Sequence, residues 1–219
     1  MKESIEVKEE LIKHPKTKIE YLSKNVQDAL LRIEIIEESW VLAGIPFDHT
    51  YGRVPGEEEI RLWSIPRSTG EFLHSLIIMQ KPKNILEIGA SAGYSTLWLA
   101  SAAATYGGWV YTCEILPEKI KLLEKNIDIS KLSNIKVLEG EAKESLKGCP
   151  SKIDFVFLDA DKAAYIDYWK KLQSFAKEGT ILVADNAVDY GWLMKDFLDE
   201  VRADKNWDSL ILPYDNGLL

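Results

Sequence analysis

Hard oxygen donors and a lysine follow two neighbouring apolar segments in the second half of this 219-residue chain. Asp159 comes directly after one apolar run, and Asp185 and Asn186 come directly after the next. Carboxylate and amide oxygens suit Mg²⁺ and similar divalent cations, which also accept water and substrate oxygens. Lys162 follows Asp159 by three residues. A lysine partly desolvated beside such a cation has a lowered pKa and can take a proton from a hydroxyl group.

Simpler interpretations stand beside this one. Asp161 is a residue type that caps helix N-termini, and we favour that role for it. Lys162 is alternatively a solvated helix lysine, and the pair Asp185 and Asn186 is alternatively a turn after a strand. The metal interpretation requires the two apolar runs to be neighbouring strands, whose ends would lie ~5 Å apart.

Three further carboxylates surround a glycine loop. Gly89 and Gly93 are spaced G-x-x-x-G, and Glu87 precedes them. The dinucleotide pattern has closer glycines and lacks this glutamate, which would repel phosphates but attract a cationic ligand. Glu114 ends the next apolar run, where it can accept hydrogen bonds from both ribose hydroxyls, and Glu141 follows the third run, near an adenine edge. The set predicts a nucleoside that carries positive charge; alternatively, these residues merely end strands and cap helices.

The elements that must position these residues alternate between strand and helix. Apolar runs predict strands at residues 84–88, 109–113, 135–138, 153–158, 180–184 and 209–213. Helices are expected at residues 94–104, 117–129, 163–176 and 192–203, with a short one after Gly140. This alternation is typical of parallel strands joined by right-handed crossovers. Ligands of such sheets bind at the carboxyl ends of the strands, which is where the candidate residues lie.

The N-terminal part differs from this pattern. Residues 17–42 carry apolar residues at spacings of three and four, which predicts an amphipathic helix. Its apolar stripe packs on the body of the domain, contacts a second subunit or covers a site. Residues 44–67 are irregular, and a helix is expected over residues 68–80. We therefore expect one domain, residues 1–219, with a helical extension and loop (1–67) before an α/β core (68–219).

Composition excludes several classes of protein. The net charge of −8 and a pI of about 5.1 argue against a nucleic-acid partner. No apolar run approaches the ~18 residues of a membrane span. With two cysteines and no signal-like N-terminus, the sequence predicts a reduced, cytoplasmic protein. The three histidines form no recognisable catalytic pair or triad.

The sequence resembles the cation-dependent O-methyltransferases, the family of catechol and caffeoyl-CoA O-methyltransferases. The resemblance covers about residues 60–217 and rests on residues 69–73, 86–89, 93–95, Glu114, 158–162, Tyr165 and 185–186. It implies a Rossmann-like class I methyltransferase fold, whose mostly parallel sheet has seven strands with the last antiparallel. Because only Leu218 and Leu219 follow the turn signal at residues 214–217, we expect that the last strand is a stub or that the chain is incomplete.

The resemblance also implies a chemistry. S-adenosylmethionine would donate a methyl group to a small catechol-like phenol, and a homodimer is expected. Mg²⁺ or another divalent cation would be held by Asp159, Asp185 and Asn186, with Lys162 as general base. The donor site would be lined by Trp63, Ile65, Glu87, Gly89, Ala90, Ser91, Gly93, Tyr94, Ser95, Glu114, Ile115, Gly140, Glu141, Ala142, Asp159, Asp161 and Tyr168.

Two segments depart from the family pattern, and both bear on the acceptor. Residues 63–67 replace a stretch rich in Met or in Ser and Thr, and residues 187–191 replace a loop rich in Trp and Gly. A methyltransferase with a non-catecholic acceptor, such as an amine or another hydroxyl, therefore stays open. Two alternatives from other classes are an NAD-dependent oxidoreductase, against which Glu87 argues, and a non-catalytic binding module.

Overall fold

Five parallel strands form the sheet of this computed structural model, which describes residues 19–43 and 61–219. The strand order is β3-β2-β1-β4-β5. The strands are β1 Asn84–Ile88, β2 Trp109–Glu114, β3 Ile135–Glu139, β4 Phe155–Leu158 and β5 Ile181–Ala184. The strands predicted between residues 84 and 184 are thus confirmed, with small differences at their ends.

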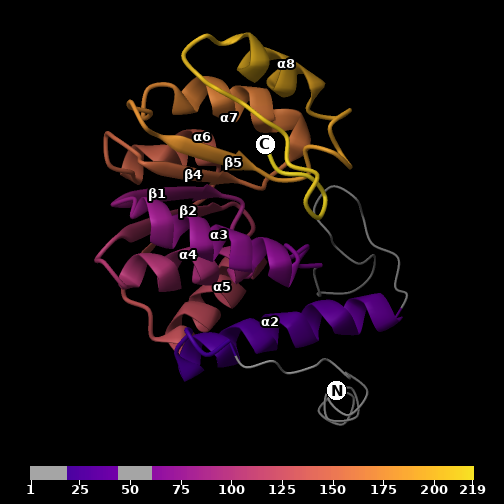
Figure 1. Cartoon of the computed structure of the whole chain (residues 1–219). Coiled ribbons are helices and arrows are strands. Elements are labelled where there is room, and N and C mark those ends of the chain that lie inside the picture. The colour runs from indigo at the N-terminus through magenta and orange to yellow at the C-terminus, as the bar shows by residue number, and fades with distance from the viewer. Residues whose placement is uncertain (1–18, 44–60) are drawn as a thin grey trace.

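Helices cover both faces of the sheet (Figure 1). One face carries α3 Arg67–Gln80, α4 Tyr94–Ala104 and α5 Pro117–Ser130. The other carries α6 Ala142–Ser145, α7 Tyr165–Leu172 and α8 Lys195–Ala203. The last two are shorter than predicted, because a 3-10 turn, Lys162–Ala164, precedes α7 and irregular backbone precedes α8.

Two apolar cores result from this layering. Phe155 and Phe157 of β4 pack into the core that α3 and α4 share, whereas Val156 and Leu158 pack into the core of α7 and α8. Successive side chains of a strand point to opposite faces, so a strand covered on both sides is apolar at every position. This explains why β4 appears in the sequence as a continuous apolar run.

The apolar stripe of the N-terminal helix packs on the domain itself. Helix α2 spans Lys24–Ala43, and its buried Val26, Leu30 and Ile33 belong to the core on the α4 and α5 side. Arg32 Nη1 also donates to Asn126 Oδ1 of α5 at 2.6 Å. The stripe therefore gives no support to a subunit contact, and the homodimer stays a prediction. Within the described ranges, no helix combines the length and apolar character of a bilayer span.

The expected seven-stranded sheet is wrong for the described residues. Residues 209–213 form no strand, and one isolated antiparallel bridge pairs Leu212 with Leu218. Ala184 of β5 exchanges two backbone hydrogen bonds with Leu219, at 2.8 and 3.0 Å. A longer ladder does not form because Pro213 has no N–H to donate and a turn follows it at once. The predicted stub therefore lies beside β5 as one residue pair.

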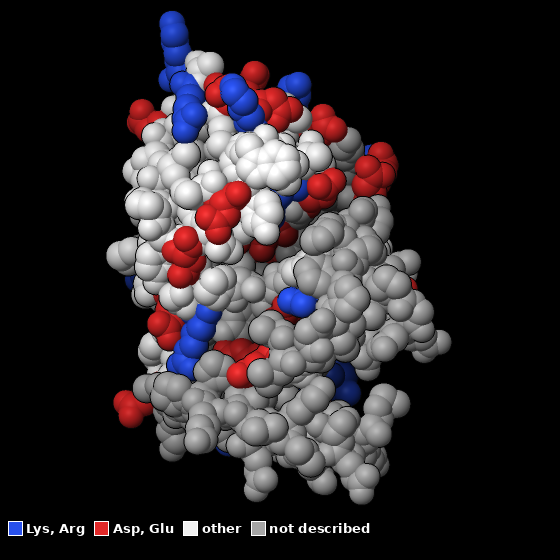
Figure 2. Space-filling model, turned by 90° about the vertical axis from the view of Figure 1, so that its right-hand side faces the viewer, with Lys and Arg blue, Asp and Glu red and all other residues white. Residues whose placement is uncertain are grey.

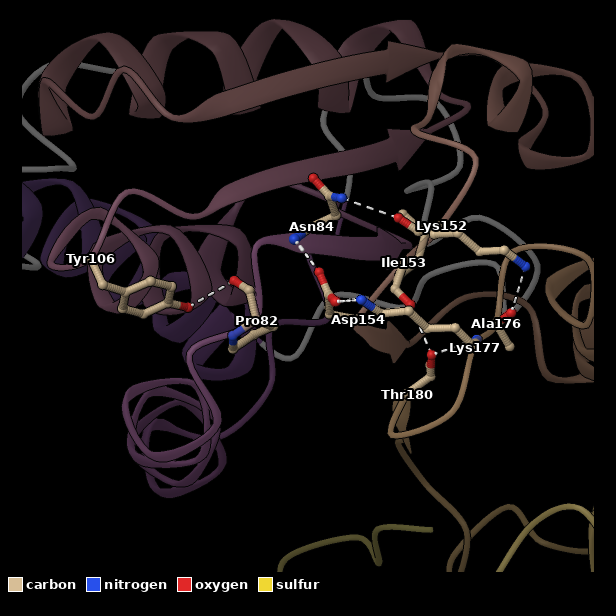
Figure 3. Close-up of polar contacts among 9 residues, drawn as sticks. All are labelled: Pro82, Asn84, Tyr106, Lys152, Ile153, Asp154, Ala176, Lys177 and Thr180. Carbon is tan, nitrogen blue, oxygen red and sulfur yellow. Dashed lines mark hydrogen bonds and ion pairs between the residues drawn. The ribbon is translucent and has the colours of Figure 1, made fainter.

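A polar network joins the amino-terminal ends of β1, β4 and β5 (Figure 3). The Asp154 carboxylate accepts a hydrogen bond from the Asn84 backbone N–H at 2.7 Å and pairs with the Lys177 ammonium. The Thr180 hydroxyl donates to the Ile153 carbonyl at 2.8 Å. Burial alone would raise the pKa of Asp154, but Lys177 and Asn84 stabilise the carboxylate and lower it.

Candidate functional site

The candidate residues gather where the strands end. The ladder continues one residue past β1 and β4, because Asp159 N–H donates to the Ile88 carbonyl at 2.9 Å and Asp185 N–H to the Leu158 carbonyl at 3.0 Å. In register, Leu158 pairs with Ala184, so Asp159 and Asp185 follow neighbouring strand ends as predicted. Figure 2 shows the side of the molecule at which the carboxyl end of β5 lies. Charged side chains of both signs lie in a hollow there.

The glycine loop is packed tightly on the metal-site segment. Gly89 has φ +101°, and a Cβ added there would lie 2.0 Å from the Asp159 carbonyl oxygen. Gly93 has φ +94°, and a Cβ there would meet Leu123 of α5 at 2.6 Å. Only glycine satisfies both the backbone angle and the close approach. The contacts with Asp159 and Leu123 thus account for the two glycines and for the spacing between them.

Glu87 lies inside the fold. Its side chain is fully buried, and its oxygens accept hydrogen bonds from the hydroxyls of Ser95, Thr96 and Thr112. Burial raises the pKa of Glu87 to about 7, although the three hydroxyls oppose the shift. The expected direct attraction of a cationic ligand by this carboxylate is therefore not what the geometry provides. Glu87 instead links β1 to β2 and α4 beneath the loop.

Glu114 lies beside the glycine loop at the end of β2. One of its oxygens accepts the Ser91 backbone N–H at 2.7 Å, and the other accepts those of Ile115 and Leu116 at 2.9 and 3.0 Å. The Ser91 hydroxyl also donates to the Leu62 carbonyl at 2.5 Å. Glu114 therefore joins the loop to the end of β2, at the position where a ribose was predicted.

The other predicted donor residues divide into two groups. Tyr94 and Ser95 are buried, and their hydroxyls donate to Glu34 of α2 and to Glu87. Ile65, Ala90 and Ala142 are buried as well. The second group is at least partly exposed and consists of Trp63, Ile115, Gly140, Glu141, Asp161 and Tyr168. Asp161 caps the turn before α7, accepting the Ala163 N–H at 3.3 Å as the simpler interpretation expected.

Three of these residues form a polar corner between β3 and α7. Burial raises the pKa of the half-buried Tyr168, and the carboxylates of Asp161 and Glu141 raise it further. These acidic groups thus lie within electrostatic range of the Tyr168 hydroxyl. The corner lies on the predicted adenine side of the donor site.

Lys162 is held by two oxygen partners. Its Nζ lies 2.7 Å from Asp159 Oδ1 and 3.0 Å from the Tyr165 hydroxyl, which in turn donates to the Leu158 carbonyl at 3.0 Å. Burial alone would lower the pKa of Lys162, but Asp159 and Tyr165 stabilise its ammonium and raise the pKa overall. This raised pKa belongs to the arrangement in which Asp159 pairs with the lysine directly, and the lowered pKa beside a bound cation stays a prediction.

Asp185 carries an unsatisfied oxygen. The residue is 2% exposed, and its Oδ1 is buried without a hydrogen-bond partner. Its pKa is raised, first by burial and then by the neighbouring Asp159 carboxylate. A buried carboxylate oxygen without a donor is costly, and a bound cation would satisfy it. Asn186 follows with φ +67°, a left-handed angle that asparagine tolerates.

The donor set is small. The described ranges contain no group of three or more His, Cys, Asp and Glu side chains that could hold a metal ion. The predicted set has two carboxylates, Asp159 and Asp185, and the amide of Asn186. Such a set fits a hard cation that completes its shell with water or substrate oxygens.

Sequence reasoning missed several charged residues at this edge. Lys119 of α5 is 5% exposed, and its Nζ lies 5.1 Å from the centroid of the Trp63 ring. Glu37 of α2 interacts with Arg61, their nearest charged atoms being 3.6 Å apart. Asp215 accepts hydrogen bonds from the hydroxyls of two residues in the first turn of α3, Ser68 and Thr69. Only the turn signal at residues 214–217 pointed to any of them.

The chain is similar to proteins of one known family. The family model described as O-methyltransferase matches residues 53–209. A catechol O-methyltransferase of Niastella koreensis is 35% identical over 133 residues, which are 58% of this chain and 60% of that protein. A catechol O-methyltransferase of Mycobacterium tuberculosis is 31% identical over 146 residues, 64% of this chain and 65% of that protein. The matches thus span less than two thirds of these relatives.

Solved structures support the fold. The SAH-bound methyltransferase of Podospora anserina superposes with a TM-score of 0.71 over 87% of this chain and 86% of that chain, at 22% identity. The SAH-bound O-methyltransferase of Bacillus cereus gives a TM-score of 0.68 over 97% of this chain and 92% of that chain, at 23% identity.

Proposed function

Because the chain belongs to the O-methyltransferase family, we propose that it transfers a methyl group from S-adenosylmethionine to a hydroxyl oxygen of a catechol-like phenol, with a divalent cation. The observation that supports this most is the buried Asp185 oxygen, which has no hydrogen-bond partner and lies at the strand end next to Asp159 and Lys162. Nothing in the packing of a strand end requires that arrangement.

The donor site in this proposal is the glycine loop and the end of β2. Gly89 lets the loop pack against the Asp159 backbone there, and Glu114 at the end of β2 is the carboxylate that would accept the ribose hydroxyls. The donor supplies a methyl group bound to a positively charged sulfur, and the sulfur keeps the bonding electrons as a neutral thioether when the methyl leaves. Since charge is neutralised in this step, positioning and exclusion of water carry much of the catalysis.

The acceptor site in this proposal is the edge between β4 and β5. Asp159, Asp185 and Asn186 would hold the cation, which when bound would bring together two neighbouring acceptor oxygens and lower the pKa of the reacting one. Lys162 lies one hydrogen bond from Asp159, so its amine is the side chain placed to carry the acceptor proton. Tyr165 orients that amine through its hydroxyl.

The test is transfer of labelled methyl from S-adenosylmethionine to catechol with added Mg²⁺, with and without a chelator. We expect label in the product that the chelator abolishes, and Asp185→Asn should behave as the chelated protein does. Transfer that is insensitive to the chelator would exclude the metal. Binding of S-adenosylhomocysteine but not NAD in a thermal-shift assay separates this proposal from an oxidoreductase.

The acceptor class needs its own comparison. The catechol O-methyltransferases of Niastella koreensis and Mycobacterium tuberculosis, to which the chain is similar, favour a catechol. The departures at residues 63–67 and 187–191 lie at this edge, so amines and single phenols belong in the same assay. Transfer to those compounds but not to catechol would replace the catechol in the proposal and leave the donor unchanged.

A further inference from the structure

Lys119 is a buried cation at the predicted donor site. It lies in the first turn of α5, and only 5% of the residue is exposed. Its ammonium lies against the Trp63 ring and interacts with the carboxylates of Glu114, Glu37 and Asp159. An aromatic face surrounded by carboxylates is an environment that favours a positive charge.

Nothing in α5 itself favours a lysine at this position. The first turn of a helix carries partial positive charge, which opposes a cation there. Burial also lowers the pKa of Lys119, since removing an ammonium from water is unfavourable, and the three carboxylates oppose this shift. The carboxylates and Trp63 therefore stabilise the lysine from outside its own helix.

The partners of Lys119 include a segment that covers the glycine loop. Glu37 accepts backbone hydrogen bonds from Leu62 and Trp63, and the Ser91 hydroxyl donates to the Leu62 carbonyl. Trp63 has φ +53°, an unusual backbone angle for a bulky residue. Lys119 thus lies between the segment formed by residues 61–63 and the end of β2.

Three partners of Lys119 are also predicted donor residues: Trp63, Glu114 and Asp159. They are aromatic and acidic groups of the predicted donor site, and the two carboxylates carry negative charge that a cationic donor would meet there. Lys119 already supplies one positive charge to that environment. A cationic donor would therefore meet partly neutralised carboxylates and a like charge nearby, whereas its neutral thioether product would not be repelled.

We propose that Lys119 is a specificity-determining residue of the donor site, whose ammonium lowers the affinity for the cationic donor relative to the neutral product. This inference rests on the proposed function, because it requires S-adenosylmethionine to bind at this edge. Lys119 sets how strongly the charge of the ligand is recognised, while Glu114 and the glycine loop recognise the nucleoside common to both ligands.

The experiment measures dissociation constants by calorimetry for S-adenosylmethionine and S-adenosylhomocysteine, with no acceptor present. Lys119→Met removes the charge and keeps most of the side-chain length, so the affinity for the cation should rise relative to the neutral compound. The ratio of the two constants should change about 15-fold, the size of the effect of one charge about 10 Å away near a protein surface. Lys119→Arg should keep the ratio of the unchanged chain.

Controls separate this effect from a structural one. Lys121→Met removes a charge from an exposed position of the same helix and should leave the ratio unchanged. If Lys119 had only a structural role, Lys119→Met would weaken the binding of both ligands equally. The ratio of the two dissociation constants in the variant would then match that of the unchanged chain. Lys119→Gln provides a second neutral side chain should the methionine variant unfold.

The outcomes distinguish the two proposals. Binding of both ligands by the unchanged chain, with an altered ratio in Lys119→Met alone, supports the role of Lys119. Binding with an unaltered ratio in both neutral variants overturns that role and leaves the proposed function intact. Absence of binding to the unchanged chain overturns the proposed donor, and the role of Lys119 with it.

Discussion

Replacement of Gly89 by alanine should destabilise the fold far more than an alanine at a glycine that has a similar backbone angle and open space around it. The new Cβ would lie 2.0 Å from the Asp159 carbonyl oxygen, 2.6 Å from its carbon and 3.1 Å from the Ala160 Cα. All three are backbone atoms, so no side chain can rotate away. The φ of +101° adds a second penalty, since alanine disfavours the left-handed region.

Gly179 is the matched control. Its φ is +83°, and nothing lies within 4 Å of the position that a Cβ would occupy. Gly179→Ala should therefore show only the backbone penalty, about 1 kcal/mol. Gly89→Ala adds overpacking against fixed backbone, about 2–3 kcal/mol more. The total expected loss at Gly89 is thus roughly 3–4 kcal/mol.

Urea unfolding followed by circular dichroism measures both variants. For an m-value of about 2–3 kcal/mol/M, the midpoint of Gly89→Ala should fall by roughly 1 M or more, and that of Gly179→Ala by less than about 0.5 M. The m-values should stay the same. Equal midpoints for the two variants would refute the close approach of the loop to Asp159 that the site depends on.

Three further predictions follow from the buried and paired charges. Asp154→Asn should lower the free energy of unfolding by about 1 kcal/mol at pH 7. Because the folded pKa of Asp154 is lowered, its stabilisation is present above the unfolded pKa of about 3.9 and is lost as pH falls through the folded value. The urea midpoints of variant and parent should therefore converge in acid, and parallel pH curves would contradict this. Glu87 has a folded pKa of about 7, above its unfolded value near 4.3, so the free energy of unfolding of the parent should fall as pH rises between those values. Glu87→Gln should show a flatter stability curve between pH 5 and pH 8. A slope equal to that of the parent would show that Glu87 is not the cause of this pH dependence. Lys162→Met should reduce methyl transfer by about 100-fold or more while S-adenosylhomocysteine still binds, and unchanged turnover would exclude Lys162 as the proton acceptor.

The sequence predicted the parts of the fold that local patterns determine. Continuous apolar runs identified β1 and β4, and Gly89 marked the turn between β1 and α4. The neighbouring positions of Asp159 and Asp185 depended on the last two strands being adjacent, which the pattern alone does not determine, since β3 and β4 are also successive and are not neighbours. What the pattern could not determine was the final strand, since residues 209–213 are apolar whether or not a partner extends beside them.

The missed features of the site depend on contacts between distant parts of the chain. Lys119 interacts with Glu37, about 80 residues earlier, and lies against Trp63. The sequence could not show that Asp159 would pair with Lys162 directly, a contact that raises the pKa of the lysine. The tertiary fold determines which charged residues come together at the site, whereas the local sequence pattern predicts where the strands end.

The network at Asp154 has a consequence for engineering the protein. It lies at the amino-terminal ends of the strands whose carboxyl ends form the candidate site, and β4 has four residues between them. At about 3.3 Å per residue, the two edges are roughly 13 Å apart. Labels or immobilisation handles can therefore be attached at the Asp154 edge without meeting the candidate site at the other end of the strand.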